Sequence, residues 1–322
     1  MTAPGPRDLG PKNLAKAIAL KVVSALLFAL LSAFIRYLGE TGVPVGQSVF
    51  FRSALAIVPV VLIYAWRREL MSAVRTSRPL GHLGRGSISV IGMFLNFAAL
   101  ARLPLVDATA ISFAAPLITV AFAAWFLGER VRIYRWSAVG VGFIGVIVML
   151  WPYLDFSQFS AEGAVAQAAA LGAMFALAGA FTNAGSVIQT RRLTATETTS
   201  SIVFYFSVIC AVAGLCTLPF GWVWPSHWQL GALIGAGLVA GLGHILLTES
   251  YRFASASVIA PFDYTMMIWV FLLGYWVFGE VPTVYVYVGS TIVVVSGLFV
   301  IWRERQLRLR RERESEGPAN VI

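Results

Sequence analysis

Long apolar stretches alternate with short polar connections along the whole chain. The stretches are roughly 18 to 25 residues long, and at about 1.5 Å per residue each can cross a hydrocarbon layer about 30 Å thick. Charged residues, Gly, Pro and Asn mark their ends. The pattern predicts an all-α membrane protein with ten transmembrane helices, over residues 17–37, 46–66, 82–101, 105–127, 136–152, 164–188, 199–220, 229–249, 257–279 and 284–302.

The composition agrees with this prediction. Hydrophobic residues make up 58% of the 322 residues and charged residues only 12%, about half the usual share of a soluble protein. Mean hydropathy is +0.79. A soluble domain of this size needs more polar side chains to cover its surface, and the connections between the stretches are too short to hold a separate catalytic domain.

The net charge of +9 is distributed unevenly along the chain. Of the 24 Lys and Arg residues, 19 lie in the two tails and the even-numbered connections, Arg102 alone lies in an odd-numbered one, and four lie within spans. Basic loops stay on the cytoplasmic side of a membrane and attract anionic lipid headgroups. We therefore expect both termini to be cytoplasmic, and lipid rather than nucleic acid to face these charges.

Two segments of the chain resemble each other. Residues 122–151 read FAAWFLGERVRIYRWSAVGVGFIGVIVMLW, and residues 273–302 read LGYWVFGEVPTVYVYVGSTIVVVSGLFVIW. Each has Gly-Glu at a helix end and a Trp 22 residues after that Glu: Glu129 to Trp151, and Glu280 to Trp302. The same helix-turn-helix therefore occurs once in each half of the chain.

The repeat predicts how the chain is organised. A tail over residues 1–15 precedes a first five-helix repeat over 16–152, and a second five-helix repeat over 164–302 precedes a basic tail over 303–322. Because each half has an odd number of spans, the second half starts on the opposite face and the two repeats are inverted. Inverted repeats are typical of secondary transporters with a substrate site near the midplane.

The paired FLGE and VFGE helix ends and the VFFRSALAIVP stretch resemble the drug/metabolite transporter superfamily, in its EamA branch. The resemblance covers about residues 16–302. It implies a carrier of a small organic metabolite in the bacterial inner membrane that works by alternating access. The segment from Thr76 to Leu100 is similar to carriers of S-adenosylmethionine, and that from Ala260 to Pro282 to riboflavin carriers; an amino-acid-like substrate is a third candidate.

Two charges lie deep within predicted spans, where insertion of each costs about 2.5–3.5 kcal/mol. Arg52 is either an anchor for an anionic group of the substrate or part of an internal salt bridge. Asp263 either binds a cationic group or a coupling proton, or pairs with an arginine. We hypothesise that both reach one midplane cavity. Lys21 and Arg36 lie near span ends, where long side chains can extend to water.

Other candidates for substrate binding are polar or aromatic residues at mid-span depth. The polar ones either bind substrate or form hydrogen bonds between helices, and the aromatic ones either stack on a planar ligand or pack against lipid. Pro116 and Pro261 are candidates for gating, since a proline removes a backbone hydrogen bond. Because the prolines stand at different places in the two repeats, we expect different bends. The binding candidates are Asn96, Ser112, Asn183, Tyr205, Tyr264 and Trp269.

The alternatives to a carrier are a membrane-embedded enzyme and a channel-type subunit. An enzyme needs a nucleophile with its base, a metal-binding motif or a close carboxylate pair, and the spans show no such pattern. We therefore predict no enzymatic activity, no cofactor and no metal. A nucleotide-binding P-loop is also missing, so a coupling proton or counter-substrate is expected to drive transport. Oligomeric state (monomer or homodimer), direction of transport and substrate stay open.

The charge distribution makes the topology testable. Reporter fusions after Arg78, Arg192 and Arg308 are expected to signal a cytoplasmic location, and fusions near Gly42, Asp155 and Pro225 a periplasmic one, because positive loops are retained inside. Opposite signals at two or more of these positions would overturn the assignment of spans.

Overall fold

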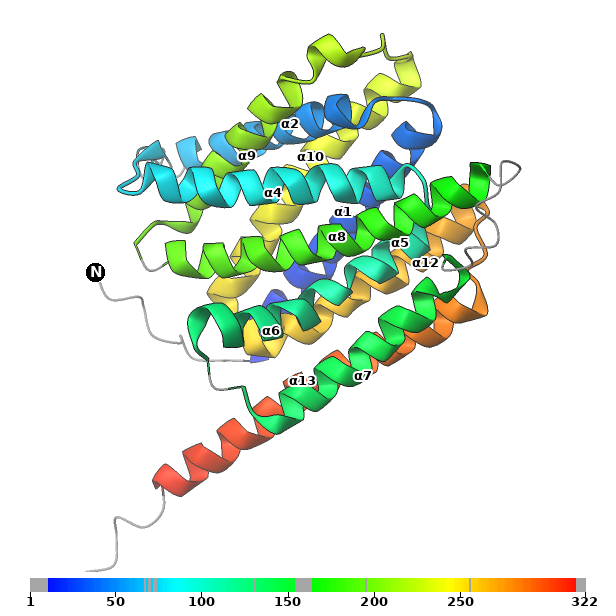
Figure 1. Cartoon of the computed structure of the whole chain (residues 1–322). Coiled ribbons are helices and arrows are strands. Elements are labelled where there is room, and N and C mark those ends of the chain that lie inside the picture. Colours follow the sequence, from blue (N-terminus) through cyan, green and yellow to red (C-terminus); the bar gives the residue numbers. More distant parts are fainter. Residues whose placement is uncertain are drawn as a thin grey trace, which may run out of the picture.

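The computed structural model describes residues 11–316 apart from 67, 69–70, 72–73, 130, 154–163, 195 and 255, and its described elements are all helical. Figure 1 shows their arrangement. The helices of the first half are α1 (Pro11–Glu40), α2 (Val45–Trp66), α4 (Pro79–Leu100), α5 (Leu105–Ser112), α6 (Ala114–Leu127), α7 (Ile133–Leu150) and the 3-10 helix η1 (Trp151–Tyr153). Those of the second half are α8 (Ala164–Leu193), α9 (Thr199–Leu215), η3 (Leu218–Phe220), α10 (His227–Phe253), α11 (Ala256–Ile259), η4 (Ala260–Tyr264), α12 (Thr265–Phe278) and α13 (Val284–Glu316).

The ten predicted spans are all found as helical segments. Over the described residues, nine helical segments are long and apolar enough to cross a membrane, and the tenth, Ser201–Leu215, is apolar but shorter. It was expected to reach residue 220, but α9 ends at Leu215 and Pro219, which has no N–H to donate, lies in the following 3-10 turn. Beyond the predicted end at 302, α13 continues to Glu316, because its Arg- and Glu-rich sequence favours helix in water too.

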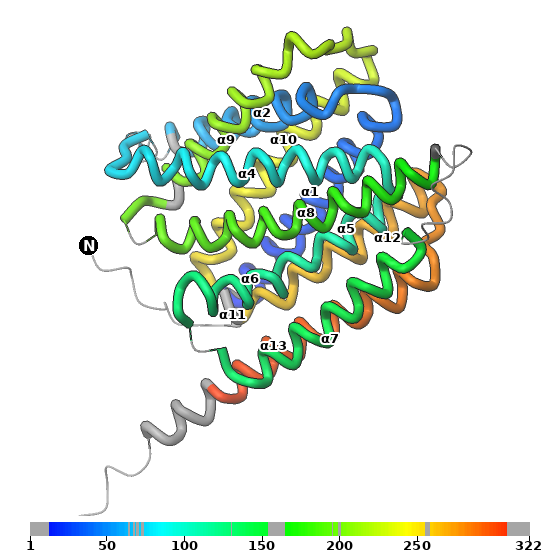
Figure 2. Tube along the Cα trace, viewed as in Figure 1, coloured from blue at the N-terminus to red at the C-terminus, as the bar shows by residue number. Residues whose placement is uncertain are grey.

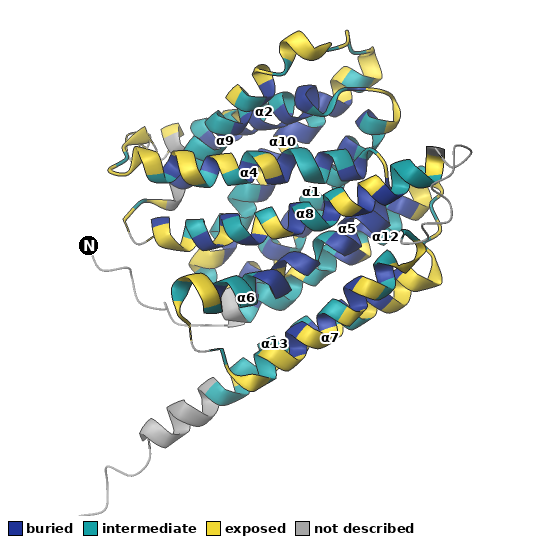
Figure 3. Cartoon of the chain, in the orientation of Figure 1, coloured by how far each residue is buried: buried dark blue, intermediate teal, exposed yellow. Residues whose placement is uncertain are grey.

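Exposed tryptophans lie near the two ends of the helical bundle. Such belts are typical of membrane–water interfaces, where the indole ring meets both lipid and headgroups. Elsewhere on the outside, exposed positions are spread along the helices (Figure 3), as expected for surfaces that face lipid. The exposed tryptophans are Trp66, Trp125, Trp136 and Trp302 at one end, and Trp151, Trp224, Trp228 and Trp276 at the other.

Helix packing follows the internal repeat. The first helix of each half packs on the third helix of the other half, α1 on α10 and α8 on α4. The corresponding second helices, α2 and α9, contact each other, and so do the fifth helices, α7 and α13. In the trace, α7 and α13 run side by side along one edge of the bundle (Figure 2). The two inverted five-helix repeats are therefore interleaved rather than set side by side.

Glycines allow the closest of these contacts. Gly237 and Gly241 of α10 face α2, where an added Cβ would meet Leu55 and Pro59. At the crossing of α7 and α13, a Cβ on Gly145 would lie 2.7 Å from the carbonyl oxygen of Gly289. Small residues are used in this way in membranes because van der Waals packing replaces the hydrophobic effect as the force between helices.

The fourth and ninth spans are both interrupted, and differently. The fourth is divided at Phe113 into α5 and α6, three residues before Pro116, which cannot donate to the carbonyl of Ser112 and crowds it. In the ninth, Pro261 lies in the five-residue 3-10 helix η4 between α11 and α12. The expectation of unequal bends is confirmed.

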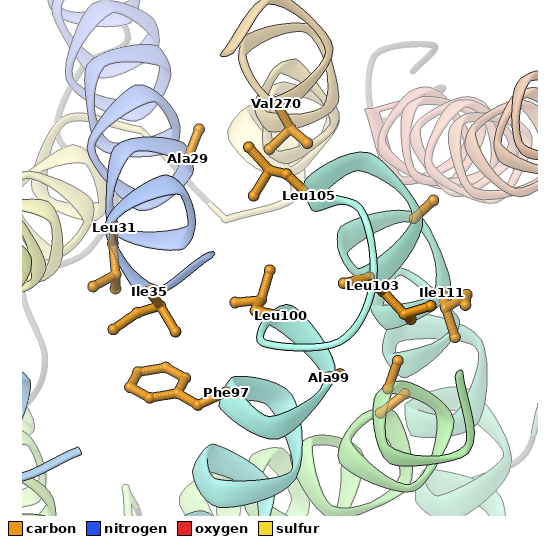
Figure 4. Packing of buried hydrophobic residues seen from close by; sticks show 14 of the residues in the cluster. Ala29, Leu31, Ile35, Phe97, Ala99, Leu100, Leu103, Leu105, Ile111 and Val270 are labelled. Carbon is orange, nitrogen blue, oxygen red and sulfur yellow. The ribbon is translucent and has the colours of Figure 1, made fainter. Parts of the chain in front are cut away.

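The hydrophobic core is concentrated toward one end of the bundle. Side chains of α1, α4, α5 and α12 gather around the turn between α4 and α5 (Figure 4). Most of the largest fully buried side chains lie at this same end, while a small separate cluster of Ala17, Ala254 and Ile259 lies at the other. The tightly packed side chains at this end are Leu38, Gln47, Val49, Leu103, Leu105, Val106, Met149 and Leu233.

The crossing of α7 and α13 makes a testable prediction. Gly145→Val places a side chain against the backbone of Gly289 and is expected to cost about 1–3 kcal/mol, typical of overpacking. Gly140→Val, on the same helix with open space around it, is the matched control. Thermal unfolding of the purified variants measures both effects; equal melting temperatures would show that α7 and α13 tolerate separation.

Candidate functional site

At the tightly packed end of the bundle, the carboxylate of Glu280 joins three parts of the chain. Its Oε1 lies 3.2 Å from Nε of Arg36 on α1, and its Oε2 accepts a 2.6 Å hydrogen bond from the backbone N–H of Leu105. Arg36 also contacts Glu40 at 2.7 Å and donates to the carbonyl of Leu100 at 3.3 Å. With side chains only 13% exposed, Arg36 and Glu280 form a nearly enclosed ion pair. We call this tightly packed end of the bundle the Glu280 end.

Glu129 occupies the corresponding place at the opposite end. Both glutamates follow a glycine in the left-handed conformation, Gly128 and Gly279, each with φ of 64°, a backbone shape that commonly ends helices and favours Gly. The Oε1 of Glu129 lies 3.2 Å from Nη1 of Arg191 on α8. Here the two side chains are 50% and 42% exposed. The same kind of pair is thus exposed at this opposite end of the bundle, which we call the Glu129 end.

The two ion pairs are crossed between the repeats. Arg36 belongs to the first helix of the first half and binds the glutamate of the second half, whereas Arg191 belongs to the first helix of the second half and binds the glutamate of the first. Each pair therefore ties the two halves together at one end of the bundle.

A cavity of about 350 Å³ opens beside the exposed pair. Two candidates named from sequence, Pro116 of α6 and Asn183 of α8, line it together with Glu129, Arg135 and Arg191. Its position places the break of the fourth span directly against the open space.

In the middle of the bundle, Arg52 of α2 is buried against α9 and α10. Its Nη2 lies 3.1 Å from Nε2 of His244, and its guanidinium carbon lies 5.4 Å from the ring centre of Phe206. Nη1 is buried and, among the described residues, has no hydrogen-bond partner. Arg52 therefore has no salt bridge of the kind considered above with any described acid.

Asp263 has a different partner from Arg52. Its Oδ1 lies 2.6 Å from Nζ of Lys21 on α1, whose side chain is only 2% exposed, whereas the side chain of Asp263, expected deep within its span, is 56% exposed. Lys21 therefore does not extend to water as expected; it is enclosed and neutralised by Asp263, and it also lies 5.3 Å from the ring of Tyr251. The structure does not bring Arg52 and Asp263 together as a pair, because each contacts another charged or polar group on another helix.

The remaining candidates lie in four places. Asn96 and Ser112 meet between α4 and α5, where Oγ of Ser112 donates to Oδ1 of Asn96 at 3.1 Å. Tyr264 stacks on Phe113 with ring centres 5.7 Å apart, which joins the breaks of the two interrupted spans. Trp269 packs against the core, and its buried indole N–H has no hydrogen-bond partner among the described residues. Tyr205 lies near the Glu129 end, where its hydroxyl donates to the carbonyl of Val74 at 2.8 Å.

Comparison with known proteins identifies the family. The EamA-like transporter family matches residues 15–151 and again residues 170–302. The chain belongs to the EamA-like transporter family. It is therefore a multi-pass inner-membrane transporter of small organic metabolites. Arg36 and Arg191 hold equivalent positions in the two repeats, since each lies 21 residues after the start of a family match.

Individual relatives of this EamA-like transporter carry different names. The S-adenosylmethionine uptake transporter of Rickettsia conorii is 28% identical over 83% of this chain and 85% of its own length. The pseudopaline exporter CntI of Pseudomonas aeruginosa is 30% identical over 88% and 95%, and the riboflavin transporter of Vibrio cholerae is 29% identical over 91% and 94%. A protein of known crystal structure aligns over 91% of this chain and 99% of its own with a TM-score of 0.62 and 19% identity, which shows the fold alone.

The transporter also contains a polar cluster that sequence reasoning missed. Glu197, in the connection between α8 and α9, accepts hydrogen bonds from the backbone N–H and hydroxyl of Ser77 at 2.9 and 2.8 Å, and lies 3.4 Å from Nε2 of His82. Burial raises the pKa of Glu197, but the hydrogen bonds from Ser77 and the nearby polar groups of His82 and Thr76 outweigh it and lower the pKa to about 2. No local pattern joins Ser77 to Glu197, since they are 120 residues apart.

This cluster predicts a pH-dependent contribution to stability. Because the folded-state pKa of about 2 lies below the ordinary 4.5, ionised Glu197 stabilises the fold above about pH 4.5, and the contribution is lost as the pH falls toward 2. Glu197→Gln is expected to lower the melting temperature at pH 7 and to differ progressively less from the unaltered protein below about pH 4.5.

The control is Glu304→Gln, which removes a partly exposed carboxylate paired with Arg135 and is expected to have a smaller effect. A difference between Glu197→Gln and the unaltered protein that stays constant from pH 7 to pH 3 would contradict the stabilising role of the ionised form.

Proposed function

We propose that this protein carries its substrate by alternating access, with the Arg36–Glu280 and Arg191–Glu129 pairs as gates at the two ends. One observation carries the proposal. The two pairs are equivalent by the internal repeat, yet the side chains of Arg36 and Glu280 are each 13% exposed, whereas those of Arg191 and Glu129 are 50% and 42% exposed. Alternating access needs two such states of one scaffold, in which one end is closed while the other is open.

The packing of the bundle supports the same proposal. The core is dense at the Glu280 end, and the 350 Å³ cavity lies at the Glu129 end. The break at Phe113, before Pro116, allows α6 to move without α5, and Pro261 with η4 serves the ninth span in the same way. In the opposite state we expect Glu129 and Arg191 to be enclosed and Glu280 and Arg36 to separate.

The distribution of basic residues supports an orientation. The Glu129 end carries the two tails and the Arg-rich connections, so we infer that it faces the cytoplasm and that both termini are cytoplasmic. In that orientation the structure corresponds to a carrier open to the cytoplasm.

The substrate is proposed to be a small organic metabolite of the kind named for the relatives, such as S-adenosylmethionine or riboflavin, or an amino-acid-like compound. A proton or a counter-substrate supplies the driving force, with Asp263 as a candidate for proton coupling. The transporter works without enzymatic chemistry, surrounded by membrane lipids, as a monomer or homodimer.

The gates are tested by labelling a cysteine behind the closed one. Ala108 lies one turn beyond Leu105 on α5 and is 2% exposed, so Ala108→Cys in a Cys216→Ser background reports opening of the Glu280 end. Arg36→Gln removes a charged pair worth on the order of 2 kcal/mol. Labelling by a membrane-impermeant thiol reagent applied at the Glu280 end is expected to rise by up to roughly thirtyfold, while Arg191→Gln lowers it or leaves it unchanged.

The controls separate gating from general damage. Arg102→Gln removes an exposed arginine at the same end that donates to the carbonyl of Ala98 and lies 5.3 Å from the ring centre of Phe175, away from Glu280. It is expected to leave labelling unchanged. Arg36→Lys keeps a positive charge beside Glu280 and is expected to retain slow labelling. Equal labelling in the Arg36→Gln variant and the unaltered protein, or a rise in both single variants, would refute the gates.

A further inference from the structure

A cluster of two arginines lies at mid-depth where the two repeats meet. Arg52 of α2 and Arg85 of α4 both lie against one aromatic ring, that of Phe206 on α9, at 5.4 and 5.1 Å from its centre. His244 of α10 completes the cluster, with its ring 6.3 Å from that of Phe206 and 5.1 Å from that of Phe28 on α1. Five helices from both repeats thus contribute to one site.

Neither arginine of this cluster contacts a carboxylate among the described residues. Arg85 donates from Nε to the hydroxyl of Thr190 at 2.6 Å and from Nη1 to the carbonyl of Ile202 at 3.2 Å, and both acceptors are neutral. The ion pairs of the described residues include neither Arg52 nor Arg85.

His244 does not compensate the arginines. A guanidinium only donates hydrogen bonds, so Nε2 of His244 must accept from Arg52 and the ring is the neutral tautomer with its proton on Nδ1. The Phe206 ring attracts cations weakly, and this single ring is shared by the guanidiniums of Arg52 and Arg85. Two positive charges and the unpaired Nη1 of Arg52 therefore remain in a medium that makes unpaired charge unfavourable.

A narrow cavity leads toward this cluster from the open end. It is lined by His244, by Val60, Val203 and Thr248 of α2, α9 and α10, and by Glu249, whose charge is paired with Arg252. Its volume of about 20 Å³ is enough for about one water molecule. An entering anionic group has to widen it, and in doing so would reach Arg52 from the side of the proposed cytoplasmic opening.

We propose that Arg52 and Arg85 form the subsite for an oxyanion of the transported metabolite, a carboxylate or a phosphate, and that this transporter selects anionic or zwitterionic cargo. The proposal rests on the proposed function, since it names the cargo of that carrier. An oxyanion offers acceptors to the unpaired Nη1 and neutralises charge shared by both guanidiniums, which is the geometry in which arginine binds carboxylate and phosphate.

The test compares pairs of compounds that differ in one charge. Purified full-length protein is screened by thermal shift with carboxylic acids against their primary amides, and with phosphate monoesters against their parent alcohols. At least one charged member is expected to bind about tenfold or more tightly than its neutral partner. For that pair, Arg52→Gln and Arg85→Gln are expected to remove the preference while leaving affinity for the neutral member unchanged, and Arg52→Lys to keep part of it.

Arg102→Gln, the loss of an exposed arginine elsewhere, is the matched control and should keep the full preference. If no charged member is preferred in the unaltered protein, or if the preference survives both Arg52→Gln and Arg85→Gln, the subsite does not exist. Should the glutamine variants fail to fold, Arg52→Lys alone must reduce the preference, and an unchanged preference there refutes the proposal. The thermal-shift screen measures binding and not transport, so its result stands even if the proposed gates fail. Likewise, Ala108→Cys labelling measures opening of the Glu280 end and does not depend on the proposed oxyanion subsite.

Discussion

The carboxylate of Glu280 joins three parts of this transporter that are far apart in the sequence. It binds the side chain of Arg36 and the backbone N–H of Leu105, so α1, the start of α5 and the end of α12 meet at one group. Away from water, each of these partners would be unfavourable without the others, because unpaired polar groups are poorly tolerated there. The dense core around the α4–α5 turn is built against this junction.

The internal repeat makes the contrast between the ends informative. Gly128 and Gly279 have the same backbone conformation, and each places a glutamate beside an arginine from the other half. The same Gly-Glu turn and the same kind of Arg–Glu pair therefore occur at both ends, and the exposure of the pair differs with the packing around it. This difference is the physical basis for the proposal that the two ends open alternately.

Charge within the bundle is treated in two different ways. Lys21 and Asp263 form a pair, whereas Arg52 and Arg85 share the ring of Phe206 and neutral acceptors. The first arrangement is complete in itself. The second is completed only by an anion, and its place between the repeats is where carriers of this architecture bind their cargo.

The sequence by itself determined the ten helices, their grouping into two inverted repeats and the family. Local rules suffice for these features, because a segment in hydrocarbon must satisfy its own backbone hydrogen bonds and must be long and apolar. The break of the fourth span likewise followed from Pro116. Only the tertiary structure decided the partners of the charged residues. Arg36 binds Glu280, 244 residues away, Lys21 pairs with Asp263, and Arg52 contacts the neutral ring of His244. Such pairings depend on which helix faces pack together, and nothing in the local sequence around either residue specifies that.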